Sequence, residues 1–159
     1  MLNRKAFCIL LIVIIGAASL QNLSAYGYRS SRIGFGLGTP NAVLIYQPAP
    51  FDLRAGYDFT QGNQFVFVSA DWRPVGHIPL TGPLHLYFGL GAYVKLYPES
   101  GSENLLEWGT RLPVGLSLLF LDNIVELFVE IAPGFDLYPK PAFSNDPVQF
   151  WAGVTFAMQ

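Results

Sequence analysis

The chain has 159 residues, of which 52% are hydrophobic, 15% aromatic and only 13% charged. This length suits one domain rather than two. Nine Lys and Arg side chains against eleven Asp and Glu give a net charge of −2, which leaves no basic surface for nucleic acid. After residue 25, no apolar run reaches the roughly 20 residues of a transmembrane helix.

The N-terminal 25 residues have the layout of a secretory signal peptide. Arg4 and Lys5 precede an apolar run at residues 6–20, and small residues follow at Ser24 and Ala25. We expect cleavage after Ala25, leaving residues 26–159 as a single barrel domain; an uncleaved anchor is the alternative. Cys8, the only cysteine, lies in this segment, so the mature chain is expected to have neither a disulfide nor a thiolate metal site.

The rest of the chain alternates between apolar and small or polar residues with a period of two, which indicates β-strands. The predicted strands are residues 32–38, 42–47, 51–59, 64–73, 84–97, 108–120, 125–137 and 148–156. The pattern of 42–47 does not show which face points which way. Residues 74–83, 98–107 and 140–147 are predicted loops. The sequence therefore predicts an all-β fold, an eight-stranded antiparallel up-and-down barrel, because closure removes exposed sheet edges.

Two kinds of barrel share this alternation and differ in which face points outward. A soluble barrel would expose a face rich in Lys, Glu and Ser, whereas the polar face here is rich in Gly and aromatic residues. Glycines suit a narrow interior where strands bend and large side chains need room. Aromatic residues at strand ends are typical of membrane interfaces; these are Phe51, Phe59, Trp72, Trp108, Phe120 and Phe156. The prediction is a transmembrane barrel, although 42–47 is short for a spanning strand.

The 108–120 and 125–137 strands form a hairpin whose turn is centred on Asp122 and Asn123. This register places Arg111 opposite Gly134, with Asp136 as its nearest carboxylate on the hairpin. A bulge at Pro113 and Pro133 would turn Asp136 to the other face.

The same reasoning places Arg54 opposite Ser69 in the preceding hairpin, and we expect Glu126 and Glu130 to meet cations across the lumen. The predicted lumen charge network is Arg54, Asp71, Arg73, Lys95, Arg111, Glu126, Glu130 and Asp136. A salt-bridged plug is favoured over a gated pore or solute site, because eight strands enclose just enough room for side chains.

Signals for catalysis are weak. His77 lies in a predicted loop, and His85 has no Ser or Asp at short spacing to orient it. We therefore predict no catalytic residue, no metal site and no cofactor.

Two stretches carry a resemblance to a known family. They are Gly109-Thr-Arg111-Leu-Pro113-Val-Gly115 followed by Glu126-Leu-Phe-Val-Glu130-Ile-Ala-Pro133, and Gly36-Leu-Gly38-Thr-Pro40. The chain resembles an uncharacterised bacterial family of small outer-membrane-type β-barrel proteins and, more distantly, the eight-stranded membrane domain of outer membrane protein A. The resemblance implies a membrane barrel and implies no reaction.

Together these patterns predict a bacterial outer-membrane protein with a plugged lumen, in contact with outer-membrane lipid, in a structural or surface-interaction role without catalysis. A narrow porin-like pore for small solutes and a soluble periplasmic barrel that binds an apolar ligand remain as alternatives. The sequence does not identify a protein partner.

Overall fold

The computed structural model describes residues 31–60, 64–74, 76–98 and 106–158. The predicted signal peptide, residues 1–25, lies outside this part of the chain, as do most of the predicted loop at 98–107 and part of the turn between the 51–59 and 64–73 strands. Within the described residues, no helix has the length and apolar character needed to cross a membrane.

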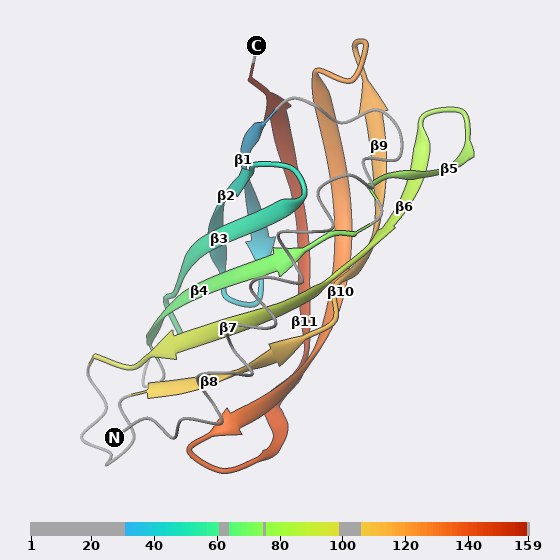
Figure 1. Cartoon of the computed structure of the whole chain (residues 1–159). Helices are drawn as coiled ribbons and strands as arrows, with labels where there is room; N and C mark the ends of the chain where they lie inside the picture. The colour runs from blue at the N-terminus through green and yellow to red at the C-terminus, as the bar shows by residue number, and fades with distance from the viewer. Residues whose placement is uncertain (1–30, 61–63, 75, 99–105, 159) are drawn as a thin grey trace.

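The described chain is built from β-strands that pair antiparallel with their neighbours (Figure 1). They are β1 Arg32–Gly38, β2 Ala42–Gln47, β3 Phe51–Asp58, β4 Phe65–Trp72, β5 Ile78–Thr81, β6 Leu84–Phe88, β7 Leu90–Leu96, β8 Leu106–Arg111, β9 Val114–Phe120, β10 Val125–Tyr138 and β11 Ala142–Ala157. β11 pairs with both β10 and β1, which closes the sheet into an eight-stranded barrel.

Two of the eight wall strands are interrupted, so each carries two labels. The predicted 84–97 strand breaks at Gly89 into β6 and β7, and the 108–120 strand breaks at Leu112 and Pro113 into β8 and β9. The two breaks lie side by side, because the Gly89 amide donates to the Pro113 carbonyl (2.9 Å). On the other side of the second break, the Leu112 amide donates to the Pro133 carbonyl of β10 (3.0 Å). Pro113 has no N–H for the ladder, which explains why regular pairing stops there.

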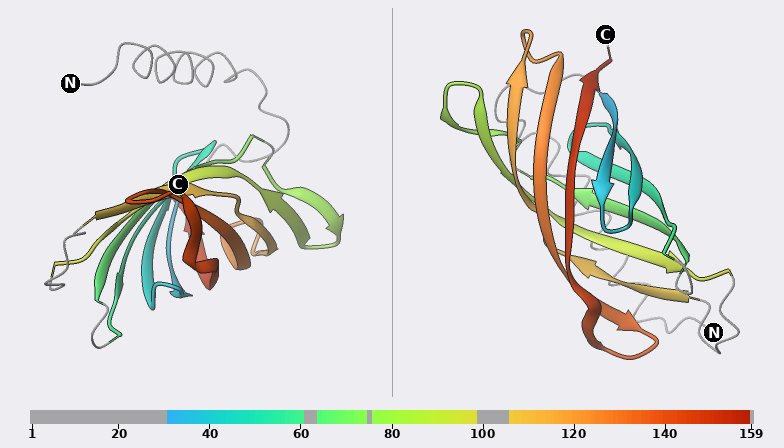
Figure 2. Two further views of the ribbon diagram at one scale, coloured as in Figure 1. Left: turned by 90° about the horizontal axis from the view of Figure 1, so that it is seen from below. Right: turned by 180° about the vertical axis from the view of Figure 1, so that it is seen from behind.

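Two predicted loops contain strands that the sequence pattern missed. β5 lies within the predicted loop 74–83 and extends the sheet beyond the end of β4 by pairing with β6. β11 begins at Ala142, inside the predicted loop 140–147, and runs beside β10 (Figure 2). Both were missed because neither segment alternates cleanly: Pro79 interrupts the first, and the second contains the run Ser144-Asn-Asp-Pro147.

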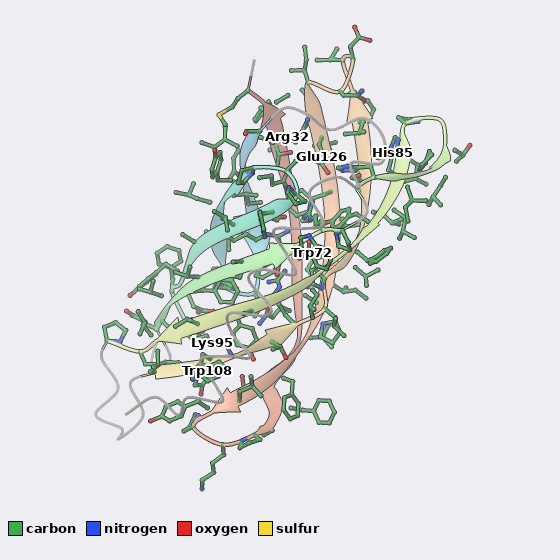
Figure 3. The ribbon with its side chains drawn as sticks, in the orientation of Figure 1. Arg32, Trp72, His85, Lys95, Trp108 and Glu126 are labelled. Carbon is green, nitrogen blue, oxygen red and sulfur yellow. The ribbon has the colours of Figure 1, made fainter. Side chains whose placement is uncertain are left out.

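The alternation of the two faces follows the prediction. Leu127 on the outer face is 45% exposed, whereas its neighbour Phe128 is 4% exposed and points inward. Figure 3 shows side chains projecting from the outside of the wall along its length. β2, whose face the sequence left open, turns Val43, Ile45 and Gln47 inward and Leu44 and Tyr46 outward.

The predicted hairpin register is confirmed, since Arg111 pairs with Gly134 and Arg54 pairs with Ser69. The bulge near Pro133 affects only the pairing of β10 with β11, so Asp136 stays buried inside the barrel. The interior also contains an apolar cluster, formed by Val43, Ile45, Phe65, Phe67, Tyr87, Tyr93, Phe128 and Trp151.

Candidate functional site: the charge network of the lumen

Six charged side chains meet in the middle of the lumen and form what we call the central network. It contains three cations and three carboxylates: Arg54, Arg73, Arg111, Asp52, Asp71 and Glu130. Asp52 and Arg54 lie on β3, Asp71 on β4, and Arg73 directly after β4; Arg111 ends β8, and Glu130 lies on β10. All six are buried. Because the charges balance, the group is neutral as a whole, as buried charges require.

Glu130 is the hub of the central network. Arg54, from the opposite wall, donates from Nη1 to Glu130 Oε1 (2.8 Å) and from Nη2 to Oε2 (2.6 Å). Arg111 adds a bond from Nη2 to Oε1 (2.5 Å), and the Tyr87 hydroxyl donates to Oε2 (3.0 Å). The paired bonds from one guanidinium to one carboxylate fix both position and orientation, so Glu130 ties β10 to β3 across the barrel.

Asp52 is the second anchor. Arg54 donates to it from Nε (3.1 Å) and Nη2 (2.9 Å), and the Gln47 amide donates to Oδ2 (3.1 Å). Arg73 also donates to Oδ2 of Asp52. Two guanidinium groups therefore join the anchors: Arg54 donates to both carboxylates, and Arg73 Nη2 lies 3.5 Å from Glu130 Oε2 as well.

The carboxylate nearest to Arg111 on its own hairpin is Glu130, at 2.5 Å, so the prediction that Asp136 is the nearest is wrong. Arg111 Nε lies 3.0 Å from Asp71 Oδ1, and its Nη1 donates to Gln149 (2.9 Å), in addition to its bond with Glu130. The guanidinium also lies 4.3 Å from the centre of the Trp151 ring. Asp136 instead accepts a hydrogen bond from the Tyr93 hydroxyl.

Aromatic rings pack against the three guanidinium groups of the central network. The Trp151 ring contacts Arg54 (4.7 Å from the ring centre) as well as Arg111, and Arg73 lies 4.1 Å from the centre of the Tyr87 ring. Such contacts stabilise desolvated cations by about 2 kcal/mol. They also fill the lumen with planar groups.

A second polar group lies near one end of the barrel, where Figure 3 labels Arg32 and Glu126. Glu126 lies 3.1 Å from Arg32 Nε, accepts from Thr155 Oγ1 (2.8 Å) and contacts His77 Nε2 (2.7 Å). Arg32 also donates from Nη1 to the Asn123 carbonyl (2.7 Å), which ties β1 to the turn after β9. His77, which precedes β5, thus reaches the buried Glu126 inside the barrel.

A third group lies toward the opposite end, where Figure 3 labels Lys95 and Trp108. Lys95 Nζ lies 3.6 Å from Glu107 and 5.5 Å from the centre of the Phe65 ring, and the Tyr97 hydroxyl donates to Glu107 (2.9 Å). Tyr93, which donates to Asp136 of β10, lies on β7 with Lys95. The pair and the group are linked by the contact of Lys95 with the Tyr93 ring (5.7 Å).

The eight side chains predicted as one network are therefore divided among three groups. Arg54, Asp71, Arg73, Arg111 and Glu130 belong to the central network, Glu126 to one end, and Lys95 and Asp136 to the other.

Sequence reasoning left out several partners. Alternation places Asp52 on the face of β3 that carries Arg54, but the predicted network did not include it. Gln47 was missed because β2 did not show its faces. Alternation predicted that Trp151 points inward but not that it contacts the arginines. Nothing in the sequence near His77 predicted its contact with Glu126.

The central network joins opposite walls of the barrel through the bonds of Arg54 to Glu130. His85 is partly exposed, and its Nδ1 lies 2.9 Å from the Pro83 carbonyl. Among the described residues, no group of three or more His, Cys, Asp or Glu side chains could hold a metal ion.

Comparisons of the chain with protein-family models, curated protein sequences and solved structures found no match. The family resemblance therefore rests on the sequence motifs alone. The eight-stranded antiparallel barrel is the part of it that the structure shows.

Proposed function

We propose that this chain is a bacterial outer-membrane protein, exported by its predicted signal peptide, whose β-strands cross the membrane around a side-chain-filled lumen. Its role would be structural or in surface interaction, without catalysis. The observation that carries the proposal is the inverted distribution of side chains. Charged residues such as Arg54 and Glu130 are buried, while large apolar residues such as Leu44, 70% exposed, cover the outside.

The outer face is too apolar for a protein surrounded by water. Exposed Leu, Ile, Val and Phe side chains occur on every wall strand from β1 to β11. Soluble monomers rarely expose a continuous apolar patch of more than a few hundred Å², because each Å² of apolar surface in water costs about 25 cal/mol. Contact with lipid hydrocarbon removes this cost, which weighs against the soluble periplasmic carrier.

Aromatic side chains near both ends support the same reading. Trp108 and Tyr138 are partners on neighbouring strands at one end, and both are about half exposed. Phe120 and Phe156 each pair with Val125 at the other end. Residues of this kind anchor barrels at membrane interfaces. Trp72 differs, because it is less exposed and lies between the two ends in Figure 3.

One wall of the barrel is short. β1 to β4 have 7, 6, 8 and 8 residues, whereas β10 and β11 have 14 and 16. A tilted spanning strand usually needs about 9–11 residues. We expect the bilayer to thin beside β1 to β4, the usual response to a short hydrophobic span.

Membrane fractionation tests the proposal. The expressed chain should sediment with outer membranes, resist extraction by high salt or alkaline carbonate, and run faster on a gel before heating than after. A protein that stayed in solution without detergent and showed no mobility change would contradict it.

Planar-bilayer recording tests the filled lumen separately. The bonds from Arg54 to Glu130 and the contact of Trp151 with Phe67, whose ring centres are 5.4 Å apart, each connect opposite walls. We therefore expect no discrete conductance. Reproducible single-channel steps would favour the narrow pore.

A further inference from the structure

Beyond the charge pairs, one side of the central network contains buried polar atoms without hydrogen-bond partners. They are Asp71 Oδ2, Ser69 Oγ, Gln149 Nε2 and Trp151 Nε1. Beside them, Asp71 Oδ1 and Arg111 Nε lie 3.0 Å apart as an ion pair. All five side chains are within a few per cent of complete burial. A buried polar atom without a partner is unfavourable, so four such atoms in one place need an explanation.

The five residues are neighbours in space although they come from three parts of the barrel. Arg111 is the centre: its Nε lies 3.0 Å from Asp71, its Nη1 donates to Gln149, and its guanidinium covers the Trp151 ring. The Trp151 ring extends from β11 to Phe67 on β4. Ser69 follows Phe67 on the inward face of β4, between Phe67 and Asp71.

The unpartnered atoms define the chemistry of a ligand. Oδ2 of Asp71 needs a donor, whereas the indole N–H of Trp151 and the side-chain amide N–H of Gln149 need acceptors. A suitable ligand must donate and accept at once. It must also be neutral, because the central network already has equal numbers of positive and negative charges.

We propose that this part of the lumen is a binding site for internal water, which bridges Asp71 to Ser69, Gln149 and Trp151. Buried water in proteins typically makes about three hydrogen bonds to polar groups that have no other partner. The lumen is then packed but hydrated at one place. This goes beyond the proposed function, because a bound water site can exist in a membrane barrel or in a soluble one.

The indole N–H of Trp151 reports on the site directly. The chain has three tryptophans, and Trp72→Phe and Trp108→Phe variants assign their indole resonances. In nitrogen-edited laboratory-frame and rotating-frame NOE spectra of the full chain in detergent micelles, the Trp151 indole proton should show a cross peak at the water frequency. Its sign should be opposite in the two spectra, as for a long-lived bound water and unlike proton exchange. A folded protein without this cross peak would overturn the proposal.

Filling the site provides the second test. Ser69→Leu places an apolar side chain where the water is proposed, and the Trp151 cross peak should be lost; Ser69→Val serves the same purpose if the larger side chain prevents folding. Ser117→Ala is the matched control, since Ser117 is another buried serine whose Oγ has no partner, on β9. Its variant should keep the cross peak. A cross peak of unchanged intensity in the folded Ser69 variants would refute the site, as would its loss in Ser117→Ala.

Discussion

Replacing Glu130 by glutamine tests whether the central network holds the barrel together. The side chain keeps its shape, but the network changes from neutral to a net charge of +1. In the native protein, Arg54 and Arg111 donate to the Glu130 carboxylate at 2.5–2.8 Å. In the variant, these guanidinium donors would face the amide group of glutamine. Removing one partner from a buried ion pair costs about 3–5 kcal/mol, so we expect Glu130→Gln to lower the free energy of unfolding by about that amount.

Urea titration of the refolded barrel in detergent micelles or lipid vesicles measures the loss, with heat-dependent gel mobility as the readout of folded protein. Glu107→Gln is the matched control. Glu107 is 16% exposed and lies 3.6 Å from Lys95, so its loss should cost under about 1 kcal/mol, as for other solvent-accessible pairs. A double variant, Glu130→Gln with Arg54→Gln, should be less destabilised than the two single variants added together, because it restores neutrality. Equal effects of Glu130→Gln and Glu107→Gln would refute the reasoning.

Two further predictions concern packing inside the lumen. Gly91→Ala should lower the free energy of unfolding by about 1–3 kcal/mol, because the added Cβ would lie 1.8 Å from Asp71 Oδ1. Gly76→Ala is the control and should have little effect, because no atom lies within 4 Å of its added Cβ. Equal urea midpoints for the two variants would count against the close packing at Gly91. Trp151→Ala should cost about 3–5 kcal/mol, since the ring contacts two guanidinium groups inside the lumen. Trp108→Ala, at a residue 43% exposed on the outer face, should lower the free energy of unfolding clearly less in the same titration. A larger loss for Trp108→Ala than for Trp151→Ala would show that the Trp151 ring does not stabilise the barrel.

The strands and their faces were predictable because each depends on neighbours in the sequence. A period of two decides which residues share a face, and a short turn decides which residues of a hairpin are opposite one another. Arg111 therefore appeared opposite Gly134, and Arg54 opposite Ser69, from the sequence alone. The same reasoning failed at β2 and β5, whose few residues do not alternate clearly enough to reveal a face or a strand.

The partners of the charged residues were not predictable in the same way. Asp136 is near Arg111 along the hairpin, yet Arg111 pairs with Glu130 and Asp71. Glu130 in turn bonds to Arg54 from the opposite wall. The pairing of opposite walls depends on the tilt and stagger with which the barrel closes, and no single hairpin contains that information.

The sequence by itself thus determined that the chain forms eight antiparallel strands with one apolar face and one face of glycines, aromatic residues and balanced charges. The division of those charges into three groups, and the contact of Trp151 with both Arg54 and Arg111, became visible only in the closed barrel. The physical reason is the range of the interactions. Alternation and turns act over a few residues, whereas contacts across a lumen join residues far apart in the chain, such as Arg54 and Glu130, and exist only once the sheet has closed.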